Sequence, residues 1–211
     1  MVLISQRVLE DVYPRAYTYL RENEKVLRAR EGGAMDHLQW YSFSRNQALD
    51  VVGAPKLITP DLAPRATFVI DDTGDYFILG GAAGGYGVIP SEPLNQFYLA
   101  GLLNSQLLSF FITQSGQRME SGYFSFEARF IRSAPIRRID FSDLADSARH
   151  DKMVSLVERM LELHRRRQAA ESEGERELLQ RQIDSTDREI DALVYELYGL
   201  SDEEVRMVEG K

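Results

Sequence analysis

The chain has 211 residues, 44% of them hydrophobic, which is enough to bury a core in one domain with an appendage or in two small domains. It has no cysteine, which excludes disulfides and thiolate metal sites, and its three histidines are too scattered for a zinc site. No apolar run is long enough to span a membrane, and charges interrupt the first residues, MVLISQRVLEDVYP, too early for a signal peptide. We therefore expect a folded cytoplasmic protein without a membrane partner.

The net charge of -8 argues at first against a nucleic-acid partner, because neutralised phosphates supply most non-specific affinity for DNA. The charge is unevenly placed. Residues 1–140 carry 14 Lys and Arg against 15 Asp and Glu, a net of -1, whereas residues 141–211 carry 11 against 18, a net of -7. Residues 112–139 are locally basic, with five arginines against two glutamates, so a basic surface is compatible with an acidic chain.

The first two-thirds of the chain predict a mixture of helices and short strands. Pro14 and the apolar spacing after it predict a helix over residues 14–31, which Gly32 and Gly33 end. PKLITPDL predicts a short strand closed by Pro60, and ATFVIDDTGDYFILGG predicts a hairpin whose second strand runs over about residues 75–79. Residues 94–104 and 106–113 predict two packed helices or one bent helix, with Asn104-Ser105 as a structural cap between them.

From Phe141 onward glycine and proline almost vanish and charged residues dominate, which indicates a domain boundary. Two apolar stripes predict an antiparallel, coiled-coil-like helical hairpin that turns at residues 171–175. Gly199 is placed as a helix C-cap, and Ser201 with Glu204 forms a capping box that opens a last short helix. The stripes are Met153, Leu156, Val157, Met160, Leu161 and His164, and Leu179, Ile183, Thr186, Ile190, Leu193 and Leu197.

The predicted fold class is therefore α+β, a short β-sheet with packed helices followed by the helical hairpin. The predicted domains are residues 1–140 and residues 141–211, the second comprising the hairpin and the short capping helix.

Motifs of catalysis are missing from the sequence. The string GGAAGGYG at residues 80–87 lacks the spacing of a phosphate-binding loop. It is read either as a flexible connection between strands or as backbone that approaches a ligand closely. No acid-x-Lys follows the Pro60-Asp61 pair, no Asn/Asp-Pro-Pro-aromatic string occurs, and no nucleophile with a base and an orienting group emerges. We therefore expect no catalysis, and no bound cofactor, from this chain alone.

The arginines of residues 118–138 are interleaved with Tyr123, Phe124, Phe126 and Phe130. Arginine can take guanine bidentately or hold phosphates, and aromatic rings can stack on bases or pack against thymine methyl groups. The same pattern is also compatible with core aromatics that have a solvated arginine fringe. Composition alone leaves both interpretations open.

The segment from Gln96 to Ile136, QFYLAGLLNSQLLSFFITQSGQRMESGYFSFEARFIRSAPI, resembles one protein family. The order of LLNS, a second apolar run, a Gly-aromatic loop and a basic stretch ending in Pro-Ile is similar to the TaqI-like C-terminal specificity domain of type II and IIG restriction-modification adenine methyltransferases. The upstream blocks YPRAYTYLRENEKVLRAR, WYSFSRNQ and PKLITPDLAPRATFVIDDTGDYFI and the closing IDALVYELYGLSDEEVRMVEG also follow the order of that family.

The resemblance implies a DNA target recognition domain, with double-stranded DNA and a methyltransferase domain or subunit as partners. S-adenosylmethionine would be bound by that methyltransferase part and not by these residues. The expected DNA contacts are Arg118, Tyr123, Arg129 and Arg132, followed by Arg45, Gln47 and Lys56. The helical hairpin, acidic on its outside, would be a spacer or docking arm.

Two other functions are compatible with the sequence. One is the specificity region of a phage-defence methyltransferase outside the restriction enzymes. The other is a protein-interaction module without direct nucleic-acid function, assembled through the helical hairpin. Steep salt dependence of binding would indicate DNA.

Overall fold

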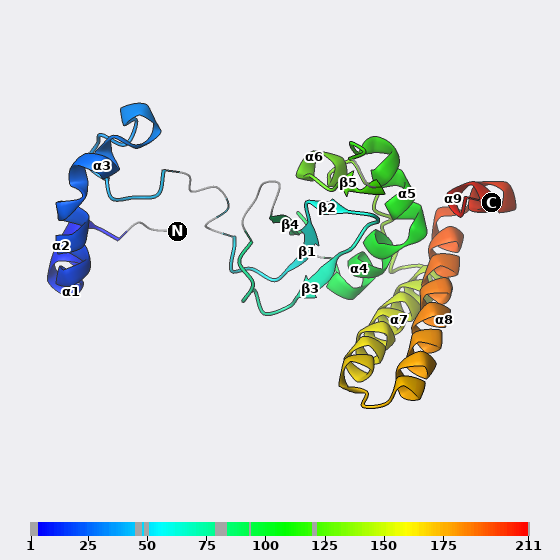
Figure 1. The fold of residues 1–211 in the computed structure, drawn as a ribbon. Helices are drawn as coiled ribbons and strands as arrows, with labels where there is room; N and C mark the ends of the chain where they lie inside the picture. Colours follow the sequence, from blue (N-terminus) through cyan, green and yellow to red (C-terminus); the bar gives the residue numbers. More distant parts are fainter. Residues whose placement is uncertain are drawn as a thin grey trace. The chain divides into compact units, whose positions relative to one another are not determined.

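The computed structural model describes residues 4–44, 48, 51–78, 84–92, 94–119 and 122–210. The chain forms two compact units, Met1–Gly53 and Ala54–Lys211. The domain boundary expected near residue 141 falls inside the second unit, where the helix that begins at Leu144 packs on an earlier helix. Figure 1 shows the order of elements in each unit.

The first unit contains helices α1 (Gln6–Val12), α2 (Pro14–Glu22) and α3 (Glu24–Arg28) and the 3₁₀ turn η1 (Arg30–Gly33). The helix predicted over residues 14–31 is therefore divided. Asn23 interrupts it, and its side-chain amide donates to the carbonyl of Tyr19. Trp40 is buried, and Arg30 fixes the loop around it by donating to the carbonyls of Trp40 and Ser42 at 2.7 and 2.9 Å.

The second unit is built on a three-stranded antiparallel sheet. Strand β1 (Lys56–Pro60) lies between β3 (Val69–Asp71) and β4 (Gly85–Val88), so the strand predicted in PKLITPDL is the centre of the sheet. The end of the glycine string belongs to β4. A Cβ added at Gly85 would lie 2.4 Å from the carbonyl oxygen of Thr59, so the close approach that glycine allows here is to a neighbouring strand.

The prediction of a hairpin over residues 66–81 is wrong in the pairing of its strands. The first strand, β3, pairs with β1, and the described residues 75–78 form no strand; Leu79 lies outside the described residues. The turn itself is present, because the Asp71 carboxylate accepts from the backbone N–H of Gly74 at 2.8 Å and of Tyr76 at 3.3 Å. The Lys56 ammonium also donates to Asp71, at 2.6 Å, and joins β3 to β1.

Helix α4 packs on this sheet, and α5 follows it in the chain and packs on α4. The segments predicted as helices are α4 (Gln96–Asn104) and α5 (Gln106–Ser115), and the predicted structural cap between them is confirmed. The Ser105 hydroxyl accepts from the N–H of Leu108, and the Asn104 amide exchanges hydrogen bonds with the backbone of Phe68 at 2.7 and 2.9 Å. The smaller elements β2 (Leu62–Ala63), β5 (Phe124–Ser125) and α6 (Ala128–Ile131) complete this side, with β2 and β5 antiparallel.

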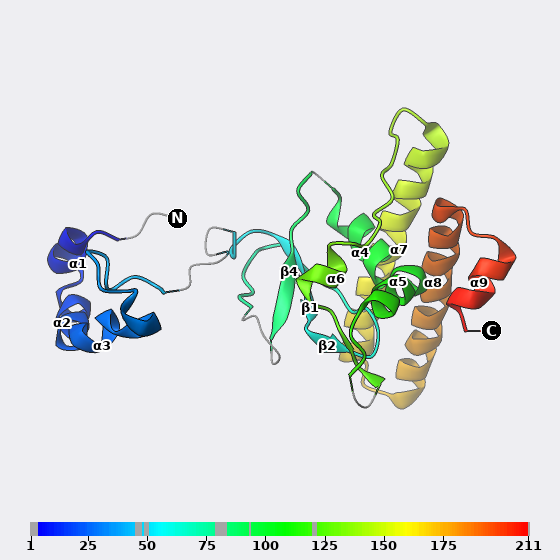
Figure 2. The same ribbon diagram turned by 90° about the horizontal axis from the view of Figure 1, so that it is seen from above.

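The predicted helical hairpin consists of α7 (Leu144–Ala169) and α8 (Glu173–Tyr198), which lie side by side in Figures 1 and 2. Every member of the stripe predicted on α8 is buried. On α7 the prediction fails at Leu161, which is 44% exposed, and at His164, which is also exposed, and Leu163 is buried instead. Gly199 ends α8 with φ of 66°, and Ser201 and Glu204 form the predicted capping box of α9 (Asp202–Val208).

The helical hairpin of α7 and α8 shares one core with the sheet. Leu57 from β1, Leu102 from α4, Leu108 from α5, Met153 from α7 and Val194 from α8 belong to the same buried cluster. Only the far end of the hairpin has a separate small cluster, formed by Leu163, Ala170, Leu179 and Ile183. The α+β class is confirmed, and within the second unit the hairpin is an integral part of the fold.

Candidate nucleic-acid interface

A β-hairpin follows α5 and carries two of the predicted DNA contacts. In this 117–125 hairpin, the N–H of Ser125 donates to the carbonyl of Gln117 at 3.0 Å, and the N–H of Met119 donates to the carbonyl of Tyr123 at 2.8 Å. Gly122, just before the second arm, has φ of 79°, a conformation that glycine adopts readily. The sequence suggested a loop here, and the pairing makes its two arms a defined structure.

The base of the 117–125 hairpin is anchored in the core, whereas its outer part faces solvent. Phe126, the next residue, is completely buried, and its N–H donates to the carbonyl of Asp61 at 2.7 Å. Ser125 pairs with Leu62 between β5 and β2. Tyr123 remains 44% exposed. Exposed side chains on a backbone held by the core are what a recognition surface requires.

The five arginines of residues 112–139 differ sharply in their surroundings. Arg118 and Arg132 are exposed and make no ion pair with any residue that the structure describes. The other three are partnered. Arg129 meets the Glu127 carboxylate at 3.1 Å and the ring of Phe130 at 4.6 Å, Arg137 meets Asp146 at 3.1 Å, and Arg138 meets Glu92 at 2.8 Å.

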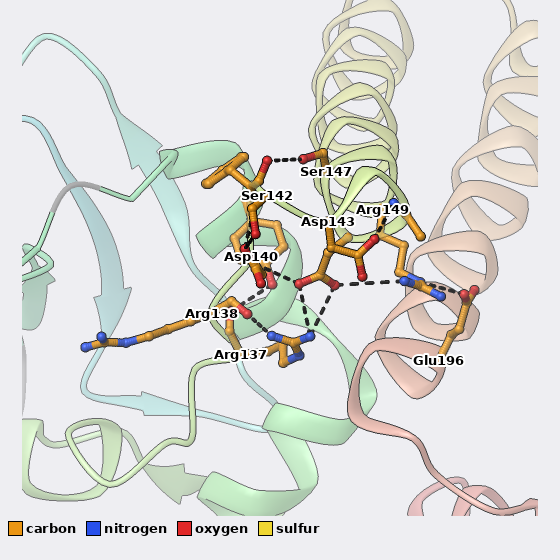
Figure 3. A network of polar contacts seen from close by, with 12 residues as sticks. Arg137, Arg138, Asp140, Ser142, Asp143, Ser147, Arg149 and Glu196 are labelled. Atoms are coloured by element: carbon orange, nitrogen blue, oxygen red, sulfur yellow. Dashed lines mark hydrogen bonds and ion pairs between the residues drawn. The ribbon is translucent and has the colours of Figure 1, made fainter.

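Arg137 has a structural role, which Figure 3 shows. Its guanidinium donates to both carboxylate oxygens of Asp146 near the start of α7, at 3.1 Å each. Asp146 is 4% exposed and also accepts from the backbone N–H of Asp140 at 2.8 Å. Arg149 continues the network to Glu196 on α8 at 2.7 Å. These contacts fasten the segment after α6 to the helical hairpin.

Arg138 extends away from that network, in the opposite direction to Arg137 (Figure 3). It lies at the edge of a groove of about 420 Å³. The groove has an aliphatic floor, to which the buried Leu99, Leu103 and Ile131 contribute. Its polar lining consists of Ser91, Glu92, Arg132 and Arg138. Sequence reasoning missed this groove, because Glu92 and Arg138 are 46 positions apart and no motif joins them.

The prediction that Lys56 contacts DNA is wrong. Its side chain is 2% exposed and its ammonium is bound to Asp71 and to the carbonyl of Ala54, so it holds the sheet together inside the protein. Burial of Asp71 opposes its ionisation, but the hydrogen bonds from Lys56, Gly74 and Tyr76 outweigh this and lower the pKa of Asp71. Arg45 and Gln47, the other two expected contacts, lie outside the described residues.

Arg118, Tyr123, Arg129 and Arg132 all belong to the second unit and are exposed, and Arg118 and Arg132 make no ion pair with a residue that the structure describes. Among the described residues, no group of three or more His, Asp or Glu side chains is arranged to hold a metal ion. No helix in the part of the chain that the structure describes is long and apolar enough to cross a membrane.

Comparison with known proteins gives one distant similarity. No family model matches the chain. The chain is 24% identical over 122 residues to the type II methyltransferase M.BstVI of Geobacillus stearothermophilus. The similar region covers 58% of this chain and 21% of that protein, so the chain spans about a fifth of the length of the relative it matches. The chain is therefore distantly and partially similar to a type II methyltransferase.

Proposed function

We propose that this chain is the DNA target recognition part of a type II restriction-modification adenine methyltransferase. The observation that carries the proposal is the 117–125 hairpin, on which Arg118 and Tyr123 are exposed while the backbone at its base is tied into the core. Arg118 is an unpaired cation within the described residues of an acidic chain. The partial similarity to a type II methyltransferase supports the same function.

In this function the hairpin reads base edges. An arginine can bind the O6 and N7 acceptors of guanine in the major groove, and a tyrosine ring can stack or pack against thymine methyl groups. A two-stranded β-ribbon is narrow enough to enter that groove. Arg118 and Tyr123 are therefore the proposed base-reading residues, and Arg129, which is paired with Glu127 and lies against Phe130, is proposed as a supporting contact.

The chemistry would belong to the methyltransferase part. That part would bind S-adenosylmethionine, extrude the target adenine and transfer the methyl group, while the 117–125 hairpin selects the site at which this happens. Helices α7 and α8 would act as the support of the recognition surface, because they share its core through Met153 and Val194. Helix α8 carries eight Asp and Glu against three Arg, which repels phosphate and favours protein contacts on its outer side, whereas α7 carries six Lys and Arg against four Asp and Glu and has no such excess.

The test is to produce the chain together with its methyltransferase part and to map methylated adenines across a host genome. Replacing both Arg118 and Tyr123 by alanine is expected to abolish methylation at the recognised sites or to relax one base position. The matched control is Arg166→Ala, which removes an exposed charge from α7 and leaves the 117–125 hairpin unchanged. An unchanged methylation pattern in the double variant would rule out the proposed reading role.

One observation favours a second function, a protein-interaction module. Tyr76 and Phe77 are 67% and 73% exposed on the turn that Asp71 holds, and Asp72 and Asp75 on the same turn are exposed as well. An aromatic surface flanked by carboxylates is suited to a basic protein partner and poorly suited to DNA. If this were the main function, the Arg118 and Tyr123 variant would keep all its binding, and a Tyr76 and Phe77 double serine variant would lose it.

A further inference from the structure

The groove beside α6 has an apolar part and a positively charged part. Its floor is aliphatic, with Leu99, Leu103 and Ile131 buried beneath it. Arg132 and Arg138, both exposed, also line the groove. None of the described residues that line it is aromatic, so the groove offers nothing for a base to stack on. It is suited to a ligand with a compact apolar body and an anionic group.

The charges at the edge are available to such a ligand. Arg132 makes no ion pair with a described residue. Arg138 is bound to Glu92 at 2.8 Å, but both side chains are exposed, at 75% and 58%. Ion pairs between exposed groups are weak, so an arriving anion can replace the Glu92 carboxylate at little cost. Within the described part of the chain, the groove therefore offers Arg132 without an ion pair and Arg138 in an ion pair that a stronger ligand can replace.

We propose that this groove binds a sugar-phosphate segment of duplex DNA, with the phosphate between Arg132 and Arg138 and the deoxyribose against the aliphatic floor. The proposal rests on the target recognition function and adds a second contact surface to it. Guanidinium groups hold phosphates through bidentate, charge-assisted hydrogen bonds, and sugar faces are largely apolar. Charge complementarity thus favours the DNA backbone over a basic or neutral protein segment.

The consequence is a division of roles between the groove arginines and Arg118. Backbone contacts fix the register and orientation of a protein on DNA but carry no sequence information. Arg132 and Arg138 would set the position of the duplex, and Arg118 on the hairpin would read it. The Glu92 carboxylate would compete with the phosphate for Arg138. This competition would lower the affinity for DNA whose backbone does not occupy the groove.

The experiment measures binding of a fluorescent duplex by anisotropy over a range of KCl concentrations, with the full chain. Arg132→Ala is expected to reduce the slope of log K against log salt by about one, equally for unrelated sequences, because one phosphate contact is lost. Glu92→Gln is expected to tighten binding about two- to fivefold, the effect of removing an exposed ion pair that competes. Arg166→Ala, an equal loss of charge on α7, is the control for long-range electrostatics.

The outcomes separate the two proposals. If Arg132→Ala and Arg166→Ala change the slope equally while the wild type binds DNA, the groove assignment is wrong and target recognition stands. If the wild type shows no salt-dependent binding to duplex DNA, both proposals fall. Inorganic phosphate at constant ionic strength is expected to compete only with the Arg132-dependent part of DNA binding, because it would occupy the same site. If phosphate binds the wild type in an Arg132-dependent way while Arg132→Ala leaves DNA binding unchanged, the groove takes free phosphate and not the DNA backbone. Arg132→Gln replaces the alanine variant if circular dichroism shows that the latter is misfolded.

Discussion

Asp191 is the group through which pH should act most clearly on the stability of this fold. It lies on α8, is 5% exposed, and its Oδ1 accepts from the backbone N–H of Gln106 at 2.8 Å, at the first residue of α5. Burial, reinforced by the negative charges of Asp187 and Glu209, raises the pKa of Asp191 to about 6, against the opposing hydrogen bonds from Gln106. The carboxylate is therefore ionised at neutral pH only at a cost to the folded state.

The size and sign of this cost follow from the pKa. A rise from the ordinary value of 3.8 to about 6 is roughly two pKa units, or on the order of 3 kcal/mol. Because the folded-state pKa is raised, the stabilising contribution is complete below pH 3.8 and is lost as the pH rises through 6. Replacing Asp191 by asparagine removes the charge, and the amide oxygen can still accept from Gln106. We expect the variant to exceed the wild type in stability by up to about 3 kcal/mol at pH 8.

Urea unfolding followed by circular dichroism, at several pH values between 4 and 8, measures this difference. The gain of Asp191→Asn should shrink between pH 6 and 4 and disappear at the acid end. Asp184→Asn, an exposed position on the same helix, is the control and should change the free energy of unfolding by less than about 0.5 kcal/mol. A variant that is less stable than the wild type by an amount that grows as the pH rises would refute the reasoning, because the ionised carboxylate would then be stabilising α5.

Three further predictions concern the packing of the second unit, each checked by urea unfolding. Lys56→Met should cause the largest loss of stability of the three, because it leaves the buried Asp71 carboxylate without its cation. Gly101→Ala should cost about 1–3 kcal/mol, because the new Cβ would lie 2.4 Å from the sulfur of Met153; a neutral result would show that Met153 can move aside. Asn104→Ala should cost about 1–2 kcal/mol, because it removes the amide that links α4 to the chain before β3, and serine should not rescue it.

The parts of the fold that local chemistry decides were predictable from the sequence. Helix ends such as Ser105, Gly199 and Ser201 depend on hydrogen bonds within a few residues, and each lies where the pattern predicts. The pairing of β3 was not predictable in this way. The turn at Asp71 is correct, but the partner strand is chosen by Lys56, fifteen positions earlier, and by the burial of Leu57.

The candidate site was also only partly predictable from the sequence. Sequence composition singled out the arginines of residues 118–138, but only the folded structure separates the unpaired Arg118 and Arg132 from Arg137, which is bound to Asp146. The groove, with Glu92 and Arg138 on its edge, depends on two loops meeting in space. The prediction for Lys56 was wrong because a lysine at the start of a strand usually faces solvent. Here Lys56 is buried with the Asp71 carboxylate, a partner that is distant in sequence.

The brevity of the outer strands has a consequence for behaviour in solution. In the described part of the chain, β3 has three residues and β4 has four, two of them glycines, and they form the two sides of the sheet around β1. Such strands offer few unpaired N–H and C=O groups in a row to another molecule. The sheet is therefore poorly suited to edge-to-edge aggregation, even where the exposed Val69 makes the side of β3 apolar.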